Sequence, residues 1–163
     1  MRKPIAALFA ALALLPAAVA AHGPEKHDKA PKPLSTDEHA WGRQGDPAKA
    51  SRTIAIGMSD AMRFTPSEVR VKQGETVRFV VKNGGKAMHE MVLGTLAELR
   101  AHGELMKKHP NMEHDEPYMA HVAPGRSQEI VWTFTKAGEF HFGCLVPGHF
   151  DAGMIGRIVV AAN

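Results

Sequence analysis

The sequence predicts an all-β protein that folds as a β-sandwich, with one helical segment inserted between two of its strands. Short runs of alternating apolar and polar residues recur along the chain from residue 51 onward. Turn-forming stretches such as Gln73-Gly74-Glu75 and Asn83-Gly84-Gly85 separate these runs. About seven short strands with turns between them are typical of a sandwich.

The strands are expected where the period of the apolar residues is two. Val77, Phe79 and Val81 share one face of the run 76–82, and a second such run lies at 127–134. Together with the remaining apolar runs, the expected strands in chain order are 53–58, 68–72, 76–82, 87–93, 127–134, 139–143 and 155–160.

The segment that follows residue 94 breaks this period. Leu96, Leu99 and Met106 recur at helical spacing, and Thr95 with Glu98 three residues later forms a capping-box signature. A stretch rich in Met and His follows this predicted helix. Residues 95–121 are therefore predicted as an insertion between two strands of the sandwich.

The first twenty residues have the three regions of a secretory signal. Arg2 and Lys3 give a positive start, residues 5–15 are apolar, and Ala18-Val19-Ala20 is a small-residue cleavage site. The short, Ala-rich core is typical of bacterial export, so we expect the protein to reach the periplasm. No later stretch is apolar enough to span a bilayer, so no membrane attachment is expected after cleavage.

Residues 21–50 are rich in Pro, Lys, Asp and Glu and have few large apolar side chains. Such a segment buries too little surface to offset its ordering entropy, so it is predicted to be a disordered tail. It carries His22, His27 and His39. These histidines are either incidental or a weak metal-collecting arm, and composition favours the first interpretation.

A single cysteine, Cys144, is present, so no internal disulfide can form. A free thiol in an oxidising compartment is a liability unless something occupies it, and a metal would do so. The net charge of +3 includes Arg2 and Lys3, which leave with the signal. The rest of the chain is close to neutral, which gives no reason to expect nucleic-acid binding.

Three soft metal ligands lie on one short stretch near the end of the chain. Cys144 is followed by His149 and then by Met154, each five residues after the last. A thiolate, imidazole and thioether suit copper, and an electron-transfer copper site needs a second imidazole. His89, at the start of a predicted strand, is the best candidate for the fourth ligand.

Four motifs stand out between residues 52 and 160: Phe64-Thr65-Pro66, Gly74-Glu75-Thr76-Val77, Met88-His89-Glu90-Met91 and Gly143-Cys144-Leu145-Val146-Pro147-Gly148-His149. With these motifs the chain resembles the cupredoxins, the blue-copper family of plastocyanin and azurin. Within that family it is most similar to the periplasmic copper-resistance cupredoxins of the CopI type. The resemblance implies a Greek-key sandwich and one type 1 copper held by His89, Cys144, His149 and Met154.

Two features depart from the pattern of plastocyanin and azurin. Those proteins usually have Asn directly after the first ligand histidine, where it helps to fix the cysteine loop, and this chain has Glu90. The Cys-x4-His-x4-Met spacing also differs from both. Either a blue centre or a more tetragonal green centre is consistent with the sequence, and the resemblance to the copper-resistance group implies a green one.

No enzyme is predicted, because Gly143 and Leu145 flank the cysteine where copper enzymes carry a histidine that leads electrons to a second copper. Two functions remain open. One is copper tolerance, for which a Met/His-rich stretch offers a second, Cu(I) site. The other is an electron shuttle that docks a redox partner on an apolar collar around His149, formed by Leu145, Val146, Pro147 and Phe150. The residues of the second copper site would be Met106, His109, Met112, His114, Met119 and His121.

Overall fold

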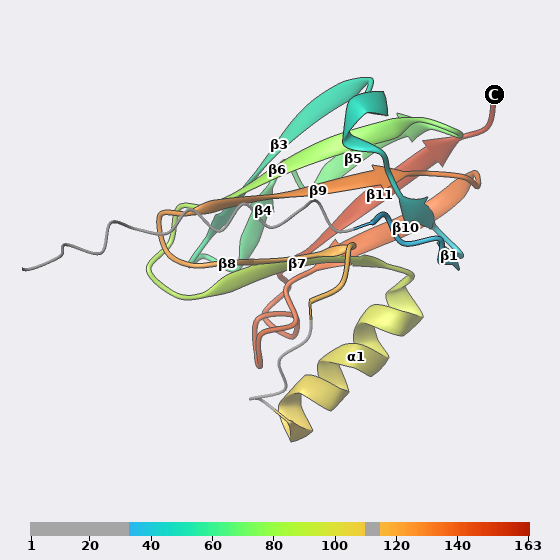
Figure 1. The fold of residues 1–163 in the computed structure, drawn as a ribbon. Coiled ribbons are helices and arrows are strands. Elements are labelled where there is room, and N and C mark those ends of the chain that lie inside the picture. The colour runs from blue at the N-terminus through green and yellow to red at the C-terminus, as the bar shows by residue number, and fades with distance from the viewer. Residues whose placement is uncertain (1–32, 110–114) are drawn as a thin grey trace, which may run out of the picture. The chain divides into compact units, whose positions relative to one another are not determined.

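A computed structural model describes residues 33–109 and 115–163 as two β-sheets packed face to face (Figure 1). The predicted signal peptide and residues 21–32 lie outside the described residues. The first sheet has the strand order β1 (Glu38–His39), β2 (Gly42–Gln44), β9 (Ser127–Thr133), β6 (Thr76–Asn83), β3 (Arg52–Ser59) and β4 (Arg63–Thr65). The second has the order β5 (Glu68–Lys72), β11 (Ile155–Ala161), β10 (Gly138–Gly143), β7 (His89–Gly94) and β8 (Met119–Val122). The predicted β-sandwich is confirmed.

Alternating side chains fill the space between the sheets. Along β6, Val77, Phe79 and Val81 are fully buried, whereas the residues between them face outward. Strand β9 pairs antiparallel with β6 and contributes Ile130 and Trp132 to the same core. The two-residue period therefore identified both the strands and their inward faces.

The second sheet places two distant segments at one point. Strands β7 and β10 are antiparallel neighbours, with Gly143 opposite Val92. The start of β7 and the end of β10 consequently lie at the same end of the sheet. His89 opens β7 and Cys144 directly follows β10, so sheet pairing brings these two residues together.

Helix α1 (Leu96–Lys108) covers the outer side of the second sheet next to β7 and β10 (Figure 1). The predicted capping box is present: Thr95 Oγ1 accepts from the Glu98 N–H, and Glu98 Oε2 accepts from the Thr95 N–H. Because α1 lies on one side and the core on the other, every residue of β7 is buried. Across the described ranges, no helix has the length and apolarity needed to cross a membrane.

The prediction of a disordered tail is wrong for residues 33–50. This segment forms β1, β2 and the 3-10 helix η1 (Pro47–Lys49), and β2 pairs with β9. Trp41 is the reason, because its ring is only 4% exposed and stacks on Trp132 at 6.3 Å and on His39 at 4.7 Å. One large aromatic ring supplies the apolar burial that the average composition of the segment does not suggest.

The insertion is also shorter than predicted. Residues 119–122 form β8, which pairs antiparallel with β7 and completes the edge of the second sheet. Met119 and His121 therefore belong to the sandwich and not to an inserted loop. A four-residue strand with a histidine in it has too weak an alternation to be recognised next to a Met/His-rich stretch.

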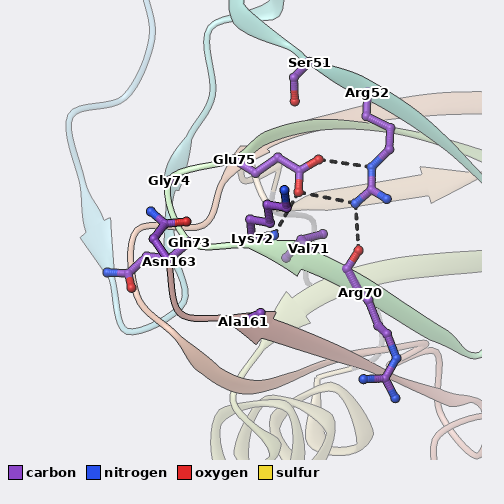
Figure 2. A pocket seen from close by; sticks show the side chains of 10 residues that line it. All are labelled: Ser51, Arg52, Arg70, Val71, Lys72, Gln73, Gly74, Glu75, Ala161 and Asn163. Carbon is purple, nitrogen blue, oxygen red and sulfur yellow. Dashed lines mark hydrogen bonds and ion pairs between the residues drawn. The ribbon is translucent and has the colours of Figure 1, made fainter.

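A pocket of about 700 Å³ opens beside the start of β3, the β5–β6 turn and the end of β11 (Figure 2). Arg52 crosses it, with its Nε 3.1 Å from Glu75 Oε1 and its Nη2 donating to the Arg70 carbonyl at 2.7 Å. None of the predicted copper ligands lines this pocket. The Arg52–Glu75 ion pair joins β3 to the β5–β6 turn.

Candidate metal centre

Three of the four predicted copper ligands meet at one end of the sandwich. Cys144 Sγ lies 3.3 Å from His149 Nδ1 and 4.0 Å from His89 Nδ1. The three ligand atoms all lie within 4.8 Å of one another. Among the described residues, this is the one group of three or more His, Cys, Asp or Glu side chains arranged to hold a metal ion.

The three ligands differ in their exposure. Cys144 and His89 are fully buried, whereas His149 is partly exposed. The rings of His89 and His149 lie 4.9 Å apart between their centroids. The centre is therefore closed on the protein side and has one imidazole edge at the surface.

Turns within the loop after β10 bring His149 back toward the cysteine. The His149 N–H donates to the Val146 carbonyl at 2.9 Å, and the intervening Gly148 has a φ of 87°. Only glycine adopts such a left-handed conformation without strain. The spacing of Cys144 and His149 is thus matched to a tight turn at Pro147-Gly148.

Met154 closes the same loop. Its N–H donates to the His149 carbonyl at 3.0 Å, and its carbonyl accepts from the Cys144 N–H at 3.1 Å. The side chain is fully buried in the core cluster that also contains Cys144. These contacts hold Met154 beside the other ligands, and axial ligation by its sulfur stays a prediction.

Glu90 fixes the loop that carries the cysteine. Its side chain is buried, and Oε1 accepts a hydrogen bond from the Leu145 N–H at 2.8 Å. Oε2 lies 2.9 Å from Nδ1 of His121 on β8. The Glu90 N–H donates to Cys144 Sγ at 3.4 Å. The departure from the usual Asn therefore retains a bond to the cysteine loop and adds an anchor on β8.

Two contacts from the β3–β4 hairpin reach the centre, one from the turn and one from the first residue of β4, and neither was predicted from the sequence. Asp60 Oδ1 lies 3.0 Å from Nε2 of His89. Arg63 Nη1 donates to the Ala152 carbonyl, in the ligand loop, at 3.0 Å. No local sequence signal predicts either contact, because each joins segments far apart in the chain.

Burial shifts the pKa values of the Cys144 thiol and the His149 imidazole in opposite directions, and both shifts favour the uncharged form. Burial raises the pKa of the Cys144 thiol to about 12, although the Glu90 N–H partly opposes that change. Burial, and then the neighbouring His89, lower the pKa of His149. At neutral pH the copper-free centre thus holds a thiol and a neutral imidazole, and metal binding must displace the thiol proton.

The donor set fits one copper ion. A mononuclear electron-transfer copper is bound by a thiolate and two imidazoles, with a thioether as a weak axial ligand. Each imidazole presents Nδ1 toward the sulfur, and the three donor atoms are close enough to share one ion. His89, Cys144 and His149 would hold the ion, and copper would supply one-electron redox chemistry there.

The predicted second copper site is not assembled as a loop of exposed ligands. Met106 and Met119 are buried in an apolar cluster with Leu99 and Leu145 beneath α1. His121 contacts Glu90, and His109 is exposed at the end of α1. Met112 and His114 lie outside the described residues, so this second site stays a prediction.

Comparison with known proteins agrees with the geometry. Residues 51–161 match the family model described as copper binding proteins of the plastocyanin/azurin family. A copper-resistant cuproprotein CopI from Rubrivivax gelatinosus is 58% identical over 120 residues, which cover 74% of this chain and 73% of that protein. CopI from Pseudomonas aeruginosa is 39% identical over 150 residues, covering 74% of this chain and 82% of that protein.

Solved structures share the fold. The dithionite-reduced auracyanin from Roseiflexus castenholzii superposes with a TM-score of 0.59 at 24% identity, covering 69% of this chain and 98% of that one. With its two-sheet sandwich and its His–Cys–His cluster, the chain belongs to the plastocyanin/azurin family of copper-binding proteins, the cupredoxins.

Proposed function

We propose that this protein serves copper tolerance in the periplasm and carries one redox-active type 1 copper held by His89, Cys144, His149 and Met154. The convergence of three donor atoms within 4.8 Å of one another is the observation that carries the proposal. Relatives named as copper-resistant cuproproteins support the copper-tolerance role. The signal-like residues 1–20 support export.

The exposure pattern supports a redox role for the copper. A thiolate and a thioether stabilise Cu(I), whereas two imidazoles also suit Cu(II), so both oxidation states are accommodated. The turn that carries His149 is fixed by main-chain hydrogen bonds, which limits rearrangement during electron transfer. The partly exposed His149 gives electrons a short route between the copper and the surface.

The thiolate–copper bond provides the direct test. Cu(II) added to copper-free protein lacking residues 1–20 should produce an intense visible band from charge transfer between thiolate and copper. Cys144→Ser should abolish this band, whereas His141→Ala, which alters a residue on β10 outside the donor set, should leave it. A colourless Cu(II) complex would refute the copper centre.

A soluble electron shuttle is the second candidate function. Pro147 is exposed and Val146 and Phe150 are partly exposed around His149, as a docking surface for a redox partner requires. Leu145, which was expected in this collar, is instead buried beneath α1, because it packs with Val92 and Leu99. A groove of about 360 Å³ separates the loop from α1 and is crossed by the Lys107–Asp151 ion pair at 2.8 Å.

Gene deletion separates the two candidates. Loss of copper tolerance with normal respiration would support the proposed role, and the single-ligand variant Cys144→Ser should reproduce that loss. A respiratory defect with unchanged copper tolerance would support the shuttle and contradict the proposal. We propose no catalytic copper in either case, because Cys144 lacks a flanking histidine.

A further inference from the structure

The carboxylate of Asp60 contacts the first ligand histidine on the side away from the sulfur. Asp60 Oδ1 lies 3.0 Å from His89 Nε2, whereas His89 Nδ1 faces Cys144 Sγ at 4.0 Å. When Nδ1 binds a metal, Nε2 carries the ring proton and donates it to Asp60. A carboxylate in this position orients a ligand imidazole and makes it a stronger donor.

Main-chain N–H groups hold this carboxylate in place. The Lys86 N–H donates to Oδ2 at 2.7 Å, and the Ala87 N–H lies 3.2 Å from Oδ1. The hydrogen bond from Lys86 and then the one from His89 lower the pKa of Asp60. The group is therefore an anion at neutral pH, held against the His89 ring although its side chain is 43% exposed.

The neighbouring backbone is shaped around Asp60. A Cβ added to Gly85 would lie 2.1 Å from Asp60 Oδ1 and 2.7 Å from its Cγ, so only glycine leaves room for the carboxylate. In the same turn, Met62 has a φ of 58°, which is rare for a side chain of this size. Such a conformation persists only where surrounding contacts determine it, and it recurs at functional sites.

We propose that Asp60 is a positioning residue that biases the copper toward Cu(II), because it holds a negatively charged carboxylate against the His89 imidazole. This inference rests on the proposed copper centre. The added charge stabilises the more highly charged ion and strengthens the imidazole donor, so it favours Cu(II) over Cu(I). Asp60 thereby lowers the reduction potential of the centre and suits it to retaining oxidised copper.

Asp60→Asn is the primary test, because Asn keeps the size and one acceptor oxygen but removes the charge. The reduction potential of the copper-loaded protein, measured by a spectroelectrochemical titration, should rise. We expect about a tenfold shift of the Cu(I)-to-Cu(II) affinity ratio, which corresponds to about 59 mV for one electron. A potential unchanged from that of the natural protein would overturn the proposal.

Two further variants separate position from charge. Gly85→Ala leaves the charge in the protein but displaces the carboxylate, so it should raise the potential in the same direction as Asp60→Asn. Asp46→Asn removes the same charge from the N-cap of η1, where Asn caps equally well. A shift of equal size in Asp46→Asn would show a general charge effect and overturn the proposal.

A measurement on copper-free protein keeps this inference distinct from the proposed function. Nitrogen-15 NMR should show the Nε2-protonated tautomer of His89 in the natural protein and a mixed population in Asp60→Asn. If Cu(II) gives no thiolate band, the copper proposal fails, whatever the tautomer. If the band is present but the reduction potential does not change in Asp60→Asn, the Asp60 inference alone fails.

Discussion

Glu90 accepts a hydrogen bond from the N–H of Leu145, the residue directly after the ligand cysteine, at 2.8 Å. The contact joins the second residue of β7 to the start of the ligand loop. His121 holds the other carboxylate oxygen from β8, so three segments meet at one buried side chain. The pairing explains how a glutamate can stand next to the first ligand histidine, at the position where the resemblance to plastocyanin and azurin leads one to expect Asn.

Glu90→Leu should destabilise the copper-free protein by about 1–3 kcal/mol, because the buried Leu145 N–H loses its acceptor. Denaturant unfolding measures the change. Glu90→Gln is the matched control, since its amide oxygen can still accept from Leu145. We expect the Gln variant to retain most of the stability and to keep the visible copper band. Equal losses in the two variants would contradict the assigned role.

The copper-free protein should lose stability as the pH rises above about 9. The folded Cys144 thiol keeps its proton until its pKa of about 12, whereas in the unfolded chain it loses the proton near its ordinary value of about 9. The folded state binds more protons in this window, so the free energy of unfolding falls with pH, by at most about 1.4 kcal/mol per unit.

Cys144→Ala removes this contribution to the pH dependence. Urea unfolding of both copper-free proteins from pH 7 to pH 10 should therefore show a steeper decline for the natural protein above pH 9. Below that pH the two curves should run parallel, because the thiol is protonated in both states. Parallel curves across the whole range would show that burial does not perturb the thiol.

Trp41→Ala should destabilise the protein by about 3–5 kcal/mol, the usual cost of removing a buried aromatic ring. Trp41 is 4% exposed and packs against Trp132, so its loss leaves a cavity at the edge of the first sheet. Leu34→Ala, at a side chain that is 44% exposed, is the control and should change stability by less than about 0.5 kcal/mol. Equal effects would indicate that residues 33–50 add nothing to the folded core.

Replacing both Met106 and Met119 with Leu should leave the number of bound Cu(I) ions unchanged. Both side chains are buried in an apolar cluster, where Leu is close in volume, so each change should cost less than about 1.5 kcal/mol. Cu(I) titration against a competing chelator provides the count. A lower count in the double variant would assign these thioethers to a second copper site.

Local sequence patterns predicted much of the sandwich. Strands β3, β5, β6, β9, β10 and β11 lie where the apolar period predicted them, and α1 begins at the predicted cap on Thr95. Strand β8 was missed because its four residues carry little periodicity, and the tail prediction failed because average composition does not register one buried tryptophan. Tertiary packing outweighs local preference at both places.

The sequence by itself determined the donor chemistry of this protein. Cys144, His149 and Met154 lie close together along the chain, so their residue types and spacing alone indicate copper. The tertiary structure decided which groups support those donors. Asp60, Arg63 and His121 act from distant turns and strands, and only antiparallel pairing and sheet packing bring them to the centre. Contacts that depend on such long-range packing leave no periodic signal along the chain.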